Sequence, residues 1–222
     1  MSKLTKIAGV EWHTSAGLTD YAEALAAMES RVSSIAKGEA AELIWLLEHP
    51  PLYTAGTSAK PDELIDARFP VHLAGRGGRY TYHGPGQRVC YVMLDLNKRG
   101  RDIRCFVHHL EGWMIAALDQ LGVKARRAPD RIGLWTDSRG AEAKIGAIGV
   151  RMRKWVSFHG FAINVAPDLS HFEGIIPCGL PDFSVTSMRD LGQNSDLPAL
   201  DLALSDCFPS FLKKFDSAIK NA

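Results

Sequence analysis

Apolar residues recur at helical spacing in three stretches of the chain. In the first stretch the steps alternate between four and three residues, which aligns the apolar side chains on one helix face. These side chains are Tyr21, Leu25, Met28, Val32 and Ile35. Thr19 or Asp20 can cap the start of this helix, and Gly38 can end it. The pattern predicts helices over residues 20–37, 102–121 and about 200–219.

Shorter apolar runs predict the strands. They cover residues 42–49, 89–96, 131–137, 143–153 and 155–165. The last two runs predict a hairpin that turns around Lys154. Strands and helices are mixed without a regular strand–helix–strand rhythm, which favours an α+β fold in which a mixed sheet carries helices packed on one side. Because no linker interrupts the pattern, we expect a single domain over residues 1–222.

Composition narrows the function classes. The chain has 222 residues, of which 46% are hydrophobic, with 26 basic and 25 acidic side chains. This balance argues against a protein that neutralises nucleic-acid phosphates. No run approaches the roughly 20 apolar residues of a membrane helix, and the first residues lack the apolar core of a signal peptide. We expect a cytoplasmic protein.

The four cysteines stand far apart, at positions 90, 105, 178 and 207. Without a paired spacing they predict neither a metal site nor a redox dithiol. Cys90 and Cys207 lie in apolar surroundings that are typical of small buried side chains. Cys178 differs, because Pro177 and Gly179 place it in a turn. Such a turn can present a thiol beside backbone N–H groups, and those of residues 178–179 are candidate oxyanion donors.

A glycine-rich segment with charged side chains covers residues 75–87, GRGGRYTYHGPGQ. Six of its thirteen residues are glycine or proline. Such a density indicates a required backbone shape or the close approach of a ligand, since glycine costs conformational entropy. It is not a nucleotide-binding P-loop, because no Gly-Lys-Ser or Gly-Lys-Thr follows it. An ordinary surface turn is the plain alternative.

Lys144 opens an apolar strand in the sequence AKIGAIGV. A lysine buried in such a place is a candidate general base, because burial disfavours its charged form. The small residues Gly146, Ala147 and Gly149 are poor strand formers, so we expect them to leave space for a ligand. An exposed lysine at a strand end is the alternative. His83 and His159 are further candidates for a base beside the thiol of Cys178.

Three segments together resemble the octanoyl-[acyl-carrier-protein]:protein N-octanoyltransferases of lipoate biosynthesis. They are RGGRYTYHGPGQ at 76–87, KIGAIGVR at 144–151 with HGFAINV at 159–165, and IIPCG at 175–179. EHPPLYTAG at 48–56 and VTS at 185–187 support the match. The resemblance covers roughly residues 40–190 in the same order. It implies the fold of biotin and lipoate protein ligases, with no cofactor and no metal.

The resemblance also implies roles for individual residues. Cys178 would form an acyl-thioester intermediate, and Lys144 would lower the pKa of its thiol and move protons. Fourteen residues match segments that line the acyl pocket: Arg76, Gly77, Gly78, Arg79, Tyr80, Thr81, Tyr82, His83, Ala147, Ile148, Gly149, Gly160, Phe161 and Ala162. Positions 79 and 80 depart from the family pattern, which has a short polar or acidic residue followed by an aliphatic one. We therefore expect Tyr80 to narrow or reshape the pocket wall.

The implied partners are octanoyl-acyl carrier protein as donor, and lipoyl domains or glycine cleavage H protein as acceptors. Of the basic clusters, Arg151, Arg153 and Lys154 are our candidate for docking the acidic donor, because they belong to the Lys144 hairpin. Three other functions fit parts of the sequence. They are an ATP-dependent lipoate or biotin ligase, a Cys/His thioesterase or amidase, and a non-catalytic acyl-binding protein.

Overall fold

The computed structural model describes residues 4–179 and 183–218, and of Cys178 it describes the backbone alone. Within these ranges nine strands form one mixed sheet. In spatial order the strands are β1 (Thr5–Ile7), β2 (Val10–Leu18), β3 (Leu43–Glu48), β7 (Gln87–Met93), β11 (Val156–Asn164), β10 (Ala141–Arg153), β9 (Arg131–Ser138) and β8 (Arg126–Ala128), and β12 (Ser184–Val185) pairs with β10. Parallel pairs join β2 to β3 and β10 to β12, and the remaining neighbours are antiparallel.

A second, smaller sheet lies beside the first. Its order is β5 (Val71–Leu73), β4 (Leu52–Ala55) and β6 (Tyr80–His83). The sequence pattern predicted none of these strands, because each is only three or four residues long and lies among glycines and prolines. The turn helix η3 (Leu169–Gly174) and the turn η4 (Pro177–Gly179) contact β6, and Leu64, which follows the short helix η1 (Pro61–Glu63), pairs with Ile175.

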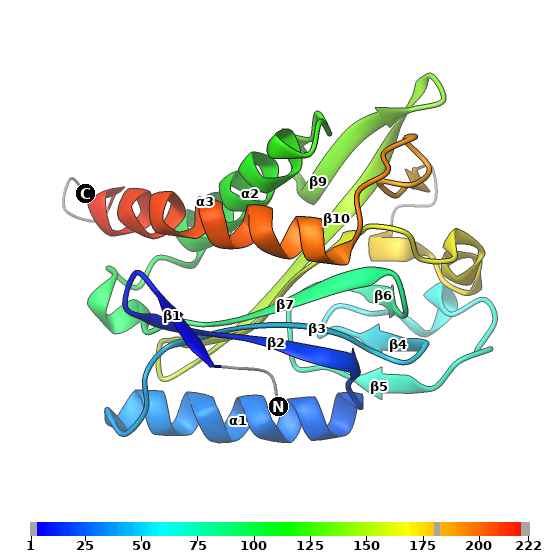
Figure 1. Ribbon diagram of the computed structural model, residues 1–222. Helices are drawn as coiled ribbons and strands as arrows, with labels where there is room; N and C mark the ends of the chain where they lie inside the picture. Colours follow the sequence, from blue (N-terminus) through cyan, green and yellow to red (C-terminus); the bar gives the residue numbers. More distant parts are fainter. Residues whose placement is uncertain (1–3, 180–182, 219–222) are drawn as a thin grey trace.

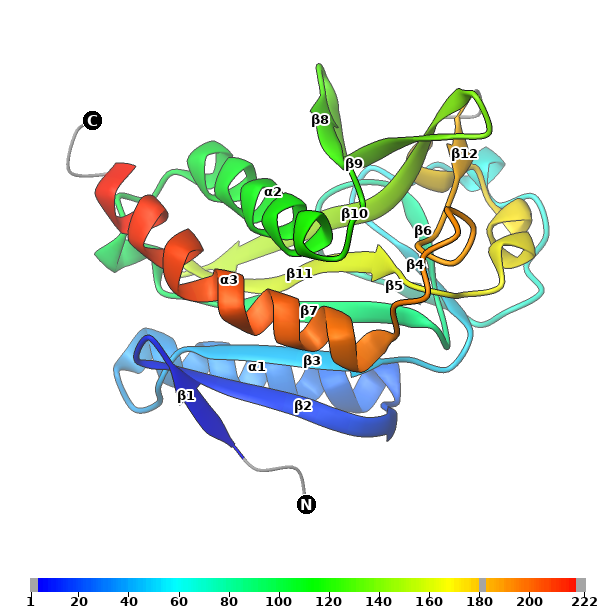
Figure 2. The same cartoon turned by 45° about the horizontal axis from the view of Figure 1, so that its top comes forward.

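Helices cover both faces of the large sheet, so the prediction of helices on one side was wrong. Helix α1 (Tyr21–Lys37) lies on one face, and helices α2 (Ile103–Gln120) and α3 (Leu197–Ala218) lie together on the other (Figures 1 and 2). The physical reason is visible in β7, in which all seven residues are buried. A strand that is apolar on both sides must be covered on both sides.

The two faces carry separate cores. Met28 and Val32 of α1 pack against Phe158 of the sheet. On the other face, Trp113 of α2 and Phe208 of α3 belong to one larger apolar cluster. Within the described residues no helix is long and apolar enough to cross a membrane.

The predicted helices and the predicted hairpin are confirmed. The Asp20 side chain accepts hydrogen bonds from the N–H groups of Ala22 and Glu23, and Gly38 ends α1 with a φ of 77°. Helix α3 begins at Leu197, three residues before its predicted start. Strands β10 and β11 pair in register up to Arg153 and Val156, so Lys154 and Trp155 form the two-residue turn between them.

Candidate active site

A cavity of about 610 Å³ lies between strands β10 and β11 and the loop at 76–79. The loop is fixed to the edge of β10, where the Gly77 N–H donates to the carbonyl of Val150 (3.1 Å). Arg76 is buried and donates through Nη2 to Thr54 O (3.0 Å) and Thr54 Oγ1 (2.6 Å). The glycine-rich segment is therefore an ordered wall of the cavity rather than an ordinary surface turn.

Twelve of the fourteen predicted pocket residues line this cavity. The exceptions are Tyr80 and Tyr82, which pack in the small apolar cluster around Tyr53 and Phe172. Neighbouring residues of a strand point to opposite faces, so in β6 the side chains of Thr81 and His83 face the cavity while both tyrosines face away. Tyr80 consequently does not narrow the cavity, contrary to our expectation.

Contacts within the protein require glycine at two positions that line the cavity, Gly149 and Gly160. A Cβ atom on Gly149 would lie 2.7 Å from Cδ of Arg76, so this glycine makes room for the arginine side chain. A Cβ atom on Gly160 would lie 2.1 Å from the carbonyl oxygen of Cys90 on the neighbouring strand. The strand pairing itself therefore requires Gly160.

Replacing Gly160 with alanine is expected to lower the free energy of unfolding by about 1–3 kcal/mol, because backbone atoms of β7 would have to move. Gly77→Ala is a matched control, since its nearest neighbour would be 3.7 Å away. Urea unfolding of both variants measures the difference. A Gly160→Ala protein as stable as the Gly77→Ala protein would contradict this account of the strand pair.

Lys144 is buried within the sheet, with 7% of its surface exposed. A β-bulge between Lys144 and Gly146 interrupts the pairing with β9 at this point, and such bulges re-aim side chains. Nζ of Lys144 donates to the carbonyl of Ile132 (3.0 Å) and lies 5.3 Å from the centre of the Trp135 ring. Gly133 makes this path possible, because a Cβ atom there would lie 2.7 Å from Cε of Lys144. The alternative of an exposed lysine was wrong.

A chain of hydrogen bonds joins the segments on which the resemblance rests. His83 Nδ1 lies 2.6 Å from Gln87 Oε1, and Gln87 Nε2 donates to Asn164 Oδ1 (2.9 Å). Asn164 Nδ2 donates to the carbonyl of Thr186 (3.0 Å). The backbone N–H of Thr186 in turn donates to the carbonyl of Lys144 (2.9 Å). These hydrogen bonds connect four segments that are distant in sequence, namely residues 83–87, Asn164, Thr186 and Lys144.

Cys178 lies in the turn η4, and its side chain lies outside the described residues. The chain before the turn is fixed by Glu63, whose carbonyl accepts the N–H of Ile176 (2.8 Å). The N–H of Gly179 donates to the carbonyl of Ile176 (3.0 Å). Because the N–H of Gly179 is engaged within the turn, it does not point to an oxyanion as the sequence predicts.

Arg79 connects the glycine-rich loop to this turn. Its Nη1 donates to the buried carboxylate of Glu63, and the same guanidinium lies directly against Gly179. A Cβ atom on Gly179 would be 2.3 Å from Nη1 of Arg79. Arg79, one of the two residues that depart from the family pattern, therefore packs against Gly179, the residue after Cys178.

A second cavity of about 20 Å³ lies where Lys144 approaches the same turn. Lys144, Ala147 and Ala162 line both this cavity and the large one, and Pro177 lines the small one. Its volume is that of about one water molecule. Pro177, the residue before Cys178, thus borders the same space as Lys144.

The two candidate histidines are weak bases here. Burial, together with the charge of Arg76, lowers the pKa of His159 to about 3. Burial and the neighbouring His49 lower the pKa of His83 to about 3 as well. A general base works best when its pKa lies near the working pH, so neither imidazole is suited to take a thiol proton at neutrality.

Sequence reasoning missed a group of buried rings at one end of the cavity. Tyr21 and Tyr91 line it, and His49 lies behind them. His49 Nδ1 is 2.6 Å from the carbonyl of Thr19, and its Nε2 is 2.7 Å from Oη of Tyr91. His49 belongs to a fragment that supported the resemblance, but nothing in its local sequence marked it as a cavity residue.

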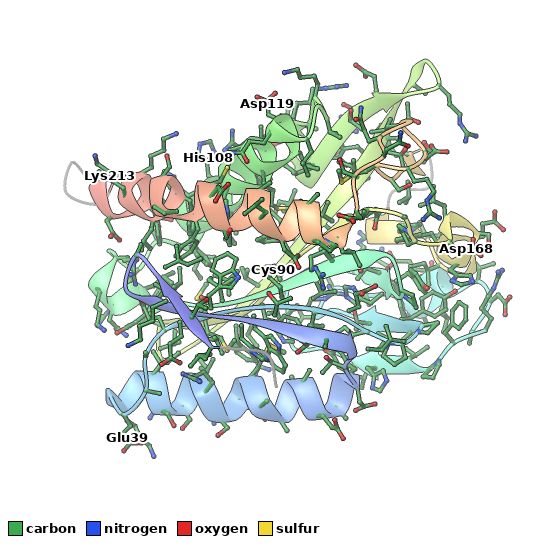
Figure 3. The ribbon with its side chains drawn as sticks, in the orientation of Figure 1. Glu39, Cys90, His108, Asp119, Asp168 and Lys213 are labelled. Atoms are coloured by element: carbon green, nitrogen blue, oxygen red, sulfur yellow. The ribbon has the colours of Figure 1, made fainter. Side chains whose placement is uncertain are left out.

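Cys90 and Cys207 were the two cysteines predicted to be small buried side chains; Cys90 is buried, whereas Cys207 is only partly buried. Cys90 is fully buried in the middle of the molecule, and burial raises the pKa of its thiol (Figure 3). Cys207 packs against the core on α3, and burial likewise raises the pKa of its thiol.

The family model of the lipoyl protein ligase A/B catalytic domain matches residues 20–209. The chain belongs to this family. An octanoyltransferase of Sphingopyxis alaskensis is 65% identical over 205 residues, which cover 92% of this chain and 94% of that protein. An octanoyltransferase of Zymomonas mobilis is 55% identical over 212 residues, covering 95% of this chain and 98% of the relative.

Solved structures of lipoate protein ligases share the fold. A putative lipoate protein ligase from T. acidophilum with bound lipoic acid matches with a TM-score of 0.72 at 18% identity, covering 91% of this chain and 85% of that chain. A lipoate-protein ligase A bound with ATP matches with a TM-score of 0.70 at 18% identity, covering 90% and 85%. The predicted α+β fold of the lipoate protein ligases is thereby confirmed.

The candidate docking cluster lies far from Lys144. Arg153 and Lys154 are at the hairpin turn, nine and ten residues along β10 from the lysine. At the rise of a strand this separation is roughly 30 Å. Arg151 is nearer the cavity, since it packs against Gly75 beside the glycine-rich loop. Ile132, which lines the cavity and is exposed, lies closer to Lys144 than this cluster does, because its carbonyl accepts from Nζ of Lys144.

Proposed function

We propose that this chain transfers an octanoyl group from octanoyl-acyl carrier protein to the lysine of a lipoyl domain or of glycine cleavage H protein. The relatives that are 55–65% identical over most of the chain are named octanoyltransferases, so the chain is an acyltransferase of lipoate biosynthesis. The observation that carries the proposal is the buried Lys144, which borders the small cavity together with Pro177, the residue before Cys178.

In the first step, Lys144 takes the proton of the Cys178 thiol. The thiolate attacks the carbonyl carbon of the donor thioester, and the tetrahedral intermediate expels the carrier's thiolate. Lys144 returns the proton to that leaving sulfur. The octanoyl group is then held on Cys178 as a thioester, and the carrier leaves as a free thiol.

In the second step, the amine of the acceptor lysine attacks the carbonyl carbon of the Cys178 thioester. The C–S bond breaks, an amide forms, and the proton lost by the amine returns to the cysteine sulfur through Lys144. A thiol serves both steps because it is a good nucleophile and a good leaving group. The balance needs neither ATP nor a metal.

The cavity supports an acyl chain as the bound group. Its wall combines the backbone of the glycine-rich loop with apolar side chains such as Val89, Ile148 and Phe161. The volume of about 610 Å³ falls within the range of small-molecule sites. The low pKa values of His83 and His159 argue against a Cys/His thioesterase, because neither histidine could serve as the base at neutral pH.

The decisive test is the intact mass of the protein after mixing with octanoyl-acyl carrier protein in the absence of ATP. We expect one octanoyl adduct that hydroxylamine removes, followed by its transfer to a lipoyl domain. No adduct, with modification of the lipoyl domain only when ATP and free octanoate are supplied, would make the chain an ATP-dependent ligase. Release of free octanoate without modification of the acceptor would make it a thioesterase.

A further inference from the structure

The turn η4, which contains Cys178, is held at both of its ends by contacts with other segments. Ile176, the residue before the turn, donates its N–H to the carbonyl of Glu63 (2.8 Å). Gly179, the last residue of the turn, lies so close to the guanidinium of Arg79 that a Cβ atom would not fit between them. The backbone of Cys178 lies between these two contacts. Its position therefore depends on Glu63 and on Arg79.

Glu63 and Arg79 are joined to each other by an ion pair. Glu63 is almost fully buried, with 3% of its surface exposed, and Arg79 is the cation that pairs with it among the described residues. Separating the pair would leave a buried carboxylate uncompensated, which is costly. One ion pair thus links the two contacts that hold the ends of η4.

Both members of the pair are also fixed by bonds of their own. The carbonyl of Arg79 accepts hydrogen bonds from the N–H of Gly56 (3.3 Å) and from Nη1 of the buried Arg76 (3.1 Å). The second carboxylate oxygen of Glu63 accepts the N–H of Lys60 (3.1 Å). Neither residue can move far without breaking these bonds. The pair is therefore a fixed support, unlike an ion pair between two mobile surface side chains.

The charge of the pair favours a mechanical role over a direct electrostatic one. Arg79 lines the large cavity together with Lys144, so its guanidinium stands near the proposed reacting groups. Its positive charge is balanced by the carboxylate of Glu63, which is in contact with it. The opposite charges of the pair largely cancel at a distance, so its effect on a nearby thiol is weaker than that of an isolated cation.

We propose that the ion pair between Arg79 and Glu63 holds the turn η4, and with it Cys178, beside Lys144. This inference rests on the proposed function in one respect, namely that Cys178 is the nucleophile. Arg79 and Glu63 are positioning residues, because each acts on Cys178 through the backbone of the turn. A displacement of about 1 Å in a reacting group can cost on the order of 100-fold in rate. Loss of the support should therefore slow acylation more than it weakens binding of the donor.

The first measurement is single-turnover formation of the octanoyl adduct with octanoyl-acyl carrier protein. We expect Arg79→Met to lower the maximal rate by roughly 10- to 100-fold. The donor concentration that gives half of the maximal rate should stay within about threefold of wild type, because the wall of the cavity is otherwise kept. Arg79→Lys retains a cation that can pair with Glu63, so it should acylate at least about fivefold faster than Arg79→Met.

The second measurement needs no acyl donor. Cys178 is alkylated with iodoacetamide across a range of pH, and the modified peptide is identified by mass. The thiolate is the reactive form, and a cation beside the thiol favours it. If η4 moves away from Lys144, the pH of half-maximal alkylation should rise by about one unit in Arg79→Met. Arg79→Lys should give a smaller rise.

Glu63→Gln distinguishes positioning from a direct effect of the Arg79 charge. A direct effect would become stronger once the neighbouring carboxylate is removed, so Cys178 would be alkylated at lower pH than in wild type. Positioning predicts the opposite result, namely alkylation at higher pH and slower acylation. The double variant Arg79→Met/Glu63→Gln should be no slower than Arg79→Met alone, because both changes remove the same support.

Arg68→Met is the matched control. Arg68 pairs with Asp66 on the surface, a few residues beyond η1, and this variant should match wild type in both measurements. An Arg79→Met protein with the wild-type alkylation profile would overturn the proposal, and so would a Glu63→Gln protein that is alkylated at lower pH. Failure of the proposed function is a different result. It would appear as the absence of an octanoyl adduct on wild type, whatever the difference in alkylation between wild type and Arg79→Met.

Discussion

Replacing Cys178 with serine is expected to slow octanoyl transfer by on the order of 10⁴-fold or more, because both steps of the proposed scheme pass through this sulfur. A serine hydroxyl is a much weaker nucleophile than a thiolate and a poorer leaving group once acylated. The rate is measured as modification of a lipoyl domain with octanoyl-acyl carrier protein as donor. Intact mass should at the same time show no octanoyl adduct on the variant.

Cys207→Ser is the matched control for this change. Cys207 lies on α3 against the core, away from the lining of the cavity, so its replacement should leave the transfer rate within about twofold of wild type. Near-normal transfer by the Cys178→Ser protein would rule out a covalent intermediate on Cys178. The acyl group would then have to pass directly from donor to acceptor.

Replacing Lys144 with methionine is expected to slow acylation of the enzyme by roughly 10²–10⁴-fold, the usual contribution of a positioned acid or base. Methionine approximates the length of the lysine side chain and suits a buried position, so the fold should persist. The buried ammonium or amine on the Ile132 carbonyl is removed, and with it the group that moves the proton. Single-turnover formation of the octanoyl adduct, followed across pH, measures the effect.

Lys124→Met separates this effect from the general loss of a positive charge. The Lys124 side chain is 84% exposed and pairs with Asp119 on the surface. That variant should acylate at the wild-type rate. A Lys144→Met protein that also acylates at the wild-type rate would mean that another group takes the thiol proton.

Local patterns were enough to predict the elements that carry their own signals. Helix α1 has its apolar stripe, its Asp20 cap and its terminal Gly38 within twenty residues. In the structure the stripe is buried, Asp20 caps the start of the helix and Gly38 ends it. The β10–β11 hairpin likewise depends on contacts between near neighbours in sequence. The same holds for the two proposed catalytic residues, since Cys178 and Lys144 each stand out against their immediate neighbours.

The tertiary structure alone decided which side chains meet. Sequence reasoning assigned all of residues 76–83 to one wall, but the pleat of β6 sends Tyr80 and Tyr82 into a different core. It interpreted Gly149 as space for a ligand, whereas this glycine accommodates the side chain of Arg76. Both outcomes depend on which strand pairs with which, and a single sequence does not contain that information locally.

What the sequence by itself determined is the chemistry and its order along the chain: a cysteine in a turn, a lysine in an apolar strand and a glycine-rich loop. What only the tertiary structure decided is the shape of the space between them. Tyr21, His49 and His159 come from α1, the segment after β3 and β11, and their rings converge only after the sheet has formed. Hydrophobic periodicity records whether a residue is buried. It does not record which distant residue a buried side chain packs against. That partner depends on the strand pairings and the helix packing that form together when the chain folds.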